Sequence, residues 1–203
     1  QTSKNYDLRN YINPYITEVF VDSVRCFNEE NGKITIKDFF KSTYEVDSLF
    51  LFNQANEQID TIKNDGNTNL IFSNLKAGRF YITLRDLSGC ESNNPYIGDV
   101  HQPKPLSFSI DSIRPVINKG GKSGIIKGKV FEGNSGLKNM TLMSEIEPDI
   151  ITDTLRAISD REFVFNKIPA GIYKIQSIDR KGCNFTVQSL QVIEPEDSLS
   201  FEV

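Results

Sequence analysis

The feature that most constrains this chain is an internal repeat with a constant offset of 93 residues. The segment AGRFYI at 77–82 is followed by DLSGC at 86–90, and the pattern returns as AGIYKI at 170–175 and DRKGC at 179–183. The matches keep their order along most of each copy, which chance does not explain. The sequence therefore predicts two copies of one module of about 90 residues.

The segments between the turn signals look like strands. They are short and rich in β-branched and aromatic residues, as in ITIK at 34–37, SLFLF at 48–52 and RFYITL at 79–84, and Asn, Asp and Gly separate them. No window sustains a helical period with caps at both ends. Short runs with turn signals at close spacing are typical of sandwiches, so we expect an all-β chain of tandem immunoglobulin-like β-sandwiches.

The repeat also predicts the domain boundaries. The segment VDSVR at 21–25 returns as IDSIR at 110–114, which indicates that the second module restarts there. We therefore expect an N-terminal arm at 1–15, a first sandwich at 16–109 and a second sandwich at 110–203. The arm is polar and rich in Asn and Tyr.

Composition excludes several functional classes. The chain of 203 residues carries a net charge of −4, with both signs scattered along it. A nucleic-acid-binding protein would need a basic face, so no nucleic-acid partner is expected. No run approaches the roughly 18 apolar residues of a membrane helix, so we do not expect the chain to span a bilayer.

The motifs that could carry chemistry are weak, and we predict no catalytic, cofactor or metal residues. The single histidine, His101, lies near the expected module junction, where a solvated role is far more common than a catalytic one. The GKS segment at 121–123 lacks the earlier glycine and the following helix of a phosphate-binding loop. The acidic turn at 64–67 has too few ligands for calcium.

Several of these motifs resemble a known family. Cys26, the GKI segment at 32–34, the LxAGxxY pattern at 75–81, DLSGC at 86–90 and the closing Gln-Pro look like the gliding-adhesin (SprB-type) repeat of Bacteroidota surface proteins. The second copy also resembles a carboxypeptidase-regulatory-like, or transthyretin-like, β-sandwich in its segments at 124–130, 163–165 and 168–173. The first copy departs from the adhesin repeat in lacking its aromatic-Trp strand, with Phe50 and Phe52 in that neighbourhood.

The resemblance implies a role for the cysteines. Cys26 and Cys90 recur in the repeat family, so the resemblance implies a disulfide between them that closes a loop of about 65 residues. Two buried free thiols are the alternative. Cys183 is then expected to be a free, buried thiol, because it has no partner left.

A second resemblance concerns modification and compartment. The tripeptide Asp-Ser/Thr-aliphatic occurs six times, where chance predicts about 0.5 occurrences, and it resembles the O-glycosylation acceptor of exported Bacteroidota proteins. The candidate hydroxyls are Ser23, Ser48, Thr61, Ser112, Thr154 and Ser198. Glycosylation requires exposed hydroxyls, with the following aliphatic residue turned inward along a strand. The alternative is a polar turn that leads into a strand.

Together these features predict a non-catalytic, exported protein or fragment at the cell surface or in the periplasm. It would serve as an adhesion, spacer or scaffold module, and its partners would be proteins of a surface or outer-membrane complex or surface glycans. The alternatives are an accessory domain of a larger secreted enzyme and a carbohydrate-binding module with an aromatic platform. The platform candidates are Tyr6, Tyr11, Tyr15, Tyr44 and Tyr96, although Tyr44 is expected to pack in the core.

Overall fold

The computed structural model describes residues 12–66, 70–131, 133, 136–146, 151–156 and 162–196. The chain divides into two compact units, Gln1–Gln102 (unit 1) and Pro103–Val203 (unit 2). The described residues are all β-strand, turn and irregular structure, without helix. Each unit has its own cluster of buried hydrophobic residues.

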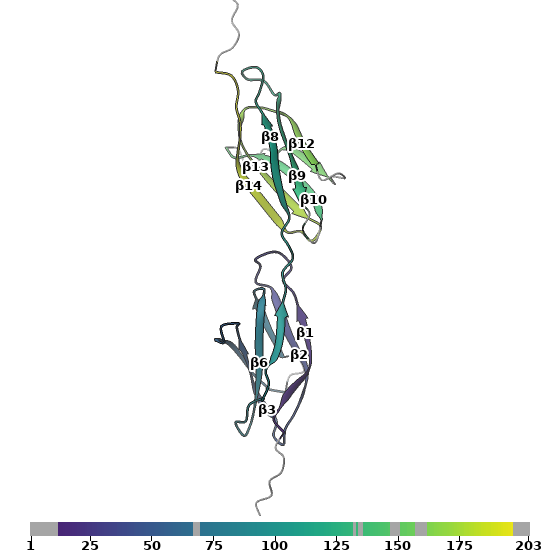
Figure 1. Cartoon of the computed structure of the whole chain (residues 1–203), viewed down its shortest axis with the longest axis vertical. Helices are drawn as coiled ribbons and strands as arrows, with labels where there is room; N and C mark the ends of the chain where they lie inside the picture. The colour runs from purple at the N-terminus through teal and green to yellow at the C-terminus, as the bar shows by residue number, and fades with distance from the viewer. Residues whose placement is uncertain are drawn as a thin grey trace, which may run out of the picture. The chain divides into compact units, whose positions relative to one another are not determined.

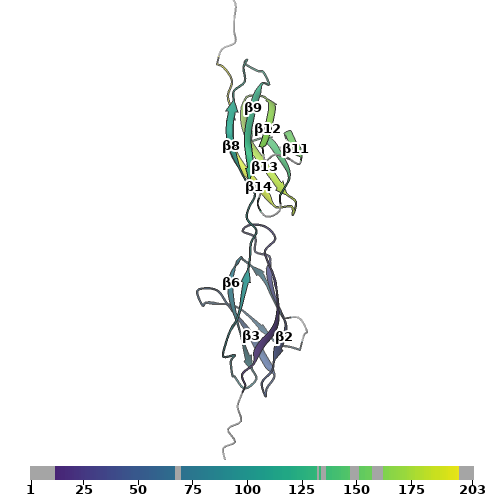
Figure 2. The same cartoon turned by 45° about the vertical axis from the view of Figure 1, so that its right-hand side comes forward.

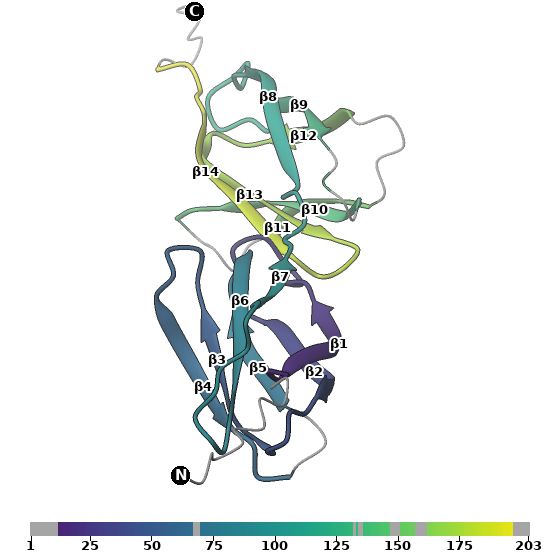
Figure 3. The same ribbon diagram turned by 60° about the horizontal axis from the view of Figure 1, so that its bottom comes forward.

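Unit 1 is a sandwich of two antiparallel sheets (Figure 1). One sheet has the strand order β1-β2-β5, and the other has the order β4-β3-β6-β7, which Figure 3 shows most clearly. The strands are β1 (Tyr15–Asp22), β2 (Gly32–Phe40), β3 (Val46–Phe52), β4 (Gln58–Lys63), β5 (Leu70–Leu75), β6 (Gly78–Asp86) and β7 (Tyr96–Val100). Seven short antiparallel strands in two packed sheets define an immunoglobulin-like sandwich. Here the fourth strand pairs with the third, which leaves three strands in one sheet and four in the other.

Unit 2 repeats this topology strand for strand, and Figure 2 shows most of its strands with their labels. Its sheets have the orders β12-β9-β8 and β11-β10-β13-β14, the orders of unit 1 with each number raised by seven. The strands are β8 (Ser107–Arg114), β9 (Gly124–Phe131), β10 (Leu137–Ser144), β11 (Ile151–Arg156), β12 (Glu162–Ile168), β13 (Gly171–Asp179) and β14 (Asn184–Val192). The sequence repeat is thus a repeat of fold.

Alternation along the strands builds both cores. In β6, Phe80, Ile82 and Leu84 are buried, while the residues between them are half-buried. Successive strand residues point to opposite sides of a sheet, so each strand contributes every second side chain to the core.

The expected boundaries need correction. The junction between residues 109 and 110 falls inside strand β8, and the division of the chain lies at 102/103 instead. Strand β8 starts three residues before the repeated IDSIR segment, so a boundary placed at that segment cuts the strand. The expected arm at 1–15 ends one residue too late, since Tyr15 begins β1. Residues 1–11 lie outside the described part of the chain.

Candidate functional site

Aromatic side chains gather on the outer side of the four-stranded sheet of unit 1. In β3, Leu49 and Leu51 are fully buried, so the alternate residues of the strand project from the opposite side of the sheet. These alternate residues and their neighbours on β6 and β7 are half-buried or exposed. We call this set the aromatic face, and it consists of Phe50, Phe52, Tyr81 and Ile97.

The strand register places these residues in rows. Phe52 pairs with Tyr81 across β3 and β6, and Tyr81 pairs with Ile97 across β6 and β7. Because neighbouring strands lie about 5 Å apart, this row spans about 10 Å across three strands. Phe50 belongs to the next row, where the Arg85 guanidinium lies 4.6 Å from the centre of its ring.

One end of the aromatic face is polar. Arg79 and Asp99 form a two-point ion pair two residues from Tyr81 and Ile97, with Nε donating to Oδ1 at 2.8 Å and a terminal nitrogen donating to Oδ2 at 3.0 Å. Hydrogen bonding from Arg79 lowers the pKa of Asp99 below its ordinary value. The pair borders a cavity of about 670 Å³, which is also lined by Gln54. Donors and acceptors therefore lie at the end of the same sheet face, two strand residues from Tyr81 and Ile97.

This face is not evident from the sequence. Phe50 and Phe52 are recognisable as strand residues, but the run SLFLF is apolar at four of its five positions, so the pattern does not show which side of the sheet each residue faces. For Tyr81, the alternation along β6 does predict an outward-facing side chain, because Tyr81 lies between buried Phe80 and Ile82.

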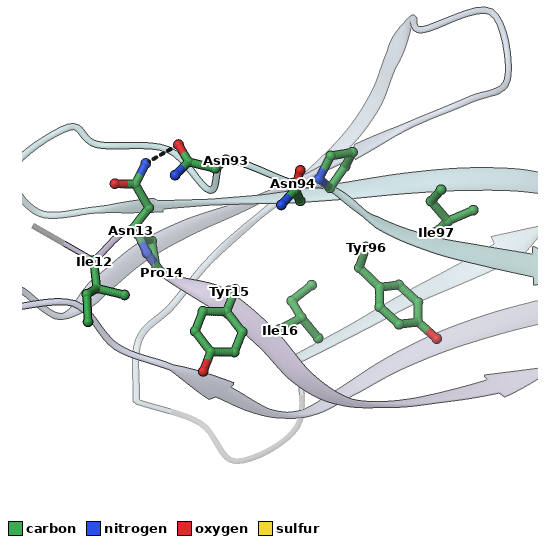
Figure 4. Close-up of a pocket in the computed structure, with 10 residues that line it drawn as sticks. Ile12, Asn13, Pro14, Tyr15, Ile16, Asn93, Asn94, Tyr96 and Ile97 are labelled. Carbon is green, nitrogen blue, oxygen red and sulfur yellow. Dashed lines mark hydrogen bonds between the residues drawn. The ribbon is translucent and has the colours of Figure 1, made fainter.

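Two of the predicted platform tyrosines lie close to one another. Tyr15 and Tyr96 both line a cavity of about 590 Å³, together with Asn13 and Asn93. In the view of Figure 4, Ile16 is drawn between the two tyrosine rings. The amide of Asn13 donates to the side-chain oxygen of Asn93 at 2.7 Å.

Tyr15 and Tyr44, two of the described platform candidates, are each about half exposed. The Tyr15 ring is 46% exposed and stacks on Phe40, with 5.0 Å between ring centres. Tyr44 was expected in the core, but that expectation is wrong, since it is 49% exposed in the turn before β3. Tyr6 and Tyr11 lie outside the described residues.

The cysteines do not pair as expected. Cys26 and Cys183 are both disulfide-bonded, and Cys90 is a free, half-buried thiol. The predicted Cys26–Cys90 bridge and the predicted free Cys183 are therefore both wrong.

Strand geometry explains why Cys26 and Cys90 cannot meet. The backbone of Val24 donates to the carbonyl of His101 at 3.0 Å, which ties the Cys26 loop to the end of β7. Cys90 lies in the turn beyond the other end of β6, where its carbonyl accepts from the backbone of Asp86 at 3.0 Å. Nine residues of β6 separate the two ends, which amounts to about 30 Å. A disulfide needs Cα atoms within about 7 Å.

Alkylation provides a direct check of this thiol assignment. We expect the denatured, unreduced protein to take one label, at Cys90, and the reduced protein to take three. A Cys90→Ser variant should take no label before reduction. Mass spectrometry of the labelled peptides locates each label, and a label at Cys26 or Cys183 before reduction would contradict the assignment.

Four of the six candidate glycosylation sites lie in the described residues. Ser23, Thr61 and Ser112 are exposed, while Ser48 is half-buried and its hydroxyl donates to Asp47 at 2.7 Å. The aliphatic residues that follow are turned inward, either fully buried or half-buried against a core, and they are Val24, Leu49, Ile62 and Ile113. The side chains of Thr154 and Ser198 lie outside the described residues.

The weak motifs have structural roles. His101 is exposed beyond β7. The hydroxyl of Ser123 accepts from the backbone of Ile117 at 2.8 Å, and strand β9 follows it directly. Among the described residues, no group of three or more His, Cys, Asp or Glu could hold a metal ion. The described residues also contain no helix long and apolar enough to cross a membrane.

Comparisons with known proteins give only distant similarity. No protein-family model matches the chain, and no curated protein matches it. A biofilm-associated protein BSP domain is 14% identical over 88% of this chain and 30% of that chain, with a TM-score of 0.32. Fibronectin(III)-like modules of Clostridium thermocellum CbhA are 12% identical over 92% of this chain and 100% of that chain, with a TM-score of 0.37.

A third similar structure is a tetra-tandem repeat from the extending region of a large adhesion protein. It is 11% identical over 86% of this chain and 48% of that chain, with a TM-score of 0.30. This chain therefore spans less than half the length of two of these three structures. With TM-scores this low, the fold assignment rests on the strand order of each unit, which defines a tandem of immunoglobulin-like modules.

Proposed function

We propose that this chain is an exported, non-catalytic pair of modules that acts in adhesion, spacing or scaffolding within a cell-surface or outer-membrane assembly. The observation that carries this proposal is the repetition of one sandwich topology in two units, each with its own core. Repeated modules of this kind present exposed edge strands and end loops as contact sites without requiring a catalytic centre. The gliding-adhesin resemblance of the sequence supports the same role.

The disulfide-bonded cysteines support export. Cys26 and Cys183 are both bonded, and disulfides persist mainly in proteins that fold outside the reducing cytosol. The proposed compartment is the cell surface or the outer-membrane side of the periplasm.

Location can be tested in the native host. Intact cells are treated with a protease that does not enter them, and the protein is then detected with an antibody. Loss of the signal from intact cells is expected for surface display, and loss only after the outer membrane is permeabilised is expected for the periplasm. A protein that resists digestion until the inner membrane is broken would overturn the proposal.

We further propose that the Asp-Ser/Thr-aliphatic sites carry O-linked glycans in the native host. The exposed hydroxyls of Ser23, Thr61 and Ser112 leave room for a bulky sugar, which a packed core would not. Intact mass of the protein purified from its host is expected to exceed the polypeptide mass, and the Thr61→Ala and Ser112→Ala variants should each lower that excess. A mass equal to the bare polypeptide would refute this proposal.

A further inference from the structure

The two units provide an internal comparison of the same sheet face. Strand register makes residues of β10 and β13 in unit 2 equivalent to residues of β3 and β6 in unit 1, because Met143 pairs with Lys174 as Phe52 pairs with Tyr81. In the next row, Thr141 stands where unit 1 has Phe50. The same sandwich therefore forms with aliphatic and polar residues at these positions, and the aromatic residues of unit 1 are not required by the fold.

The polar end of the face differs in the same way. In unit 1, Arg79 pairs across the strands with Asp99, and in unit 2 the equivalent pair is Ile172 and Gln191. The aromatic rings and the Arg79–Asp99 ion pair are thus both present in unit 1, and the matching positions of unit 2 have neither. A surface of aromatic rings beside a few polar groups is the composition of a ligand site.

Charge on and around this face favours an uncharged ligand. Arg79 is paired with Asp99, Arg85 with Glu91, and Lys63 lies 3.9 Å from Asp47. Each of these cations has an anion beside it, so the face offers little net charge to a polyanion or polycation. A partner without net charge therefore matches the balanced charge of this face best.

The area of the face favours a small partner over a second protein. Three rings that are each at most about one-third exposed and one isoleucine that is 53% exposed present at most about 300 Å² of apolar surface, since a whole aromatic side chain covers about 150–250 Å². A stable protein interface needs about 800 Å² per partner. A row about 10 Å long, with hydrogen-bonding groups at one end, instead fits a short stretch of a linear sugar chain.

From these observations, we propose that the aromatic face of unit 1 binds a neutral glycan. The apolar faces of sugar rings stack on Phe52 and Tyr81, and Arg79, Asp99 and Gln54 exchange hydrogen bonds with the sugar hydroxyls at the polar end. This inference deepens the proposed surface function and rests on it for the setting in which such glycans occur.

The test uses the residues that unit 2 already carries as replacements. The double variant Phe52→Met/Tyr81→Lys puts into unit 1 the side chains that the same fold accepts in unit 2. The matched control, Met143→Ala/Lys174→Ala, changes the equivalent positions of unit 2. Circular dichroism and thermal unfolding of each variant establish that it folds.

Binding is measured with the full chain by saturation-transfer NMR and calorimetry. The probes are cellohexaose, xylohexaose, mannohexaose and chitohexaose, with hexagalacturonate as a charged counterpart. We expect at least one neutral probe to bind with a Kd of about 0.1–1 mM. We expect the Phe52→Met/Tyr81→Lys variant to weaken that binding at least about tenfold and the control variant to change it less than about twofold.

Three results would overturn the glycan inference. They are no binding of any neutral probe at about 10 mM, equal binding by the Phe52→Met/Tyr81→Lys variant, and binding of hexagalacturonate alone. A chain that is displayed at the surface but fails these binding tests refutes the glycan inference and leaves the proposed function standing. A chain confined to the cytoplasm refutes the proposed function whatever the sugars do.

Discussion

Replacing Asp86 with alanine is expected to destabilise unit 1 by about 3 kcal/mol and to leave unit 2 folded. Asp86 is only 2% exposed. One carboxylate oxygen accepts from the backbone and the hydroxyl of Ser88 at 2.9 and 2.7 Å and from the backbone of Cys90 at 3.0 Å. The other accepts from the hydroxyl of Ser42 at 2.7 Å. Alanine would leave these donors without their acceptor inside the turn.

Unit 2 contains the matched control for this substitution. Asp179 is 4% exposed and accepts from the backbones of Lys181 and Cys183 at 2.9 and 2.8 Å. Asp179→Ala is therefore expected to destabilise unit 2 and to spare unit 1. Hydrogen-exchange mass spectrometry during a urea titration assigns each transition to its unit. An Asp86→Ala chain whose unit 1 opens at the wild-type midpoint would show that the carboxylate does not hold the turn.

The sequence predicted those parts of the fold that depend on short-range patterns of residues. The repeated Asp-x-x-Gly-Cys turn and the alternation in residues 79–84 are short-range signals, and they give the all-β class and the two copies. The start of β8 was missed because Ser107 precedes the repeated segment and no breaker separates it from that segment. The repeat locates equivalent residues, and it does not locate the first hydrogen bond of a strand.

The predicted Cys26–Cys90 disulfide was wrong because the two cysteines lie at opposite ends of the sandwich of unit 1. The resemblance placed Cys26 and Cys90 in one module, but a pairing also depends on which end of a strand each turn occupies. Strand β6 runs the length of the sandwich between the two positions. The expectation could have been excluded by counting the residues of the strand that ends at the Cys90 turn.

The aromatic face could be predicted only in part. Along β3 every residue from Leu49 to Phe52 is apolar, so hydrophobicity does not say which side faces the core. Comparison of the copies does carry a signal, because a core position should stay apolar in both. Tyr81 is matched by Lys174, which excludes that position from the core, whereas Phe80 is matched by Tyr173 and is buried in both units.

The second large effect is expected at Gly128, where adding a single methyl group should destabilise unit 2 by about 3 kcal/mol. A Cβ at this position would meet the carbonyl oxygen of Ser109 on β8 and would lie 2.5 Å from the ring of Phe163 on β12. The carbonyl is backbone of a paired strand, and the ring is only 2% exposed inside the core. Neither group can move away cheaply in a densely packed interior.

Unit 1 shows how the sandwich fills the same place differently. The residue equivalent to Gly128 is Ile36, which pairs with Leu70 as Gly128 pairs with Phe163. Unit 1 therefore has two aliphatic residues of intermediate size where unit 2 has a glycine and a large aromatic ring. Combining Gly128→Ala with Phe163→Leu should recover part of the stability that Gly128→Ala loses, because the shorter side chain removes the ring contact but not the carbonyl contact.

Urea unfolding of the two single variants and the double variant measures this coupling as a double-mutant cycle. Lys127→Ala, at the exposed neighbouring position of β9, serves as the control and should stay within about 0.5 kcal/mol of wild type. Unfolding of unit 1 should be unchanged in every variant, since its core shares no residue with that of unit 2. A Gly128→Ala chain with wild-type stability would mean that β8 and β12 yield to a methyl group, and that the close approach of the three strands does not fix the packing of this sheet.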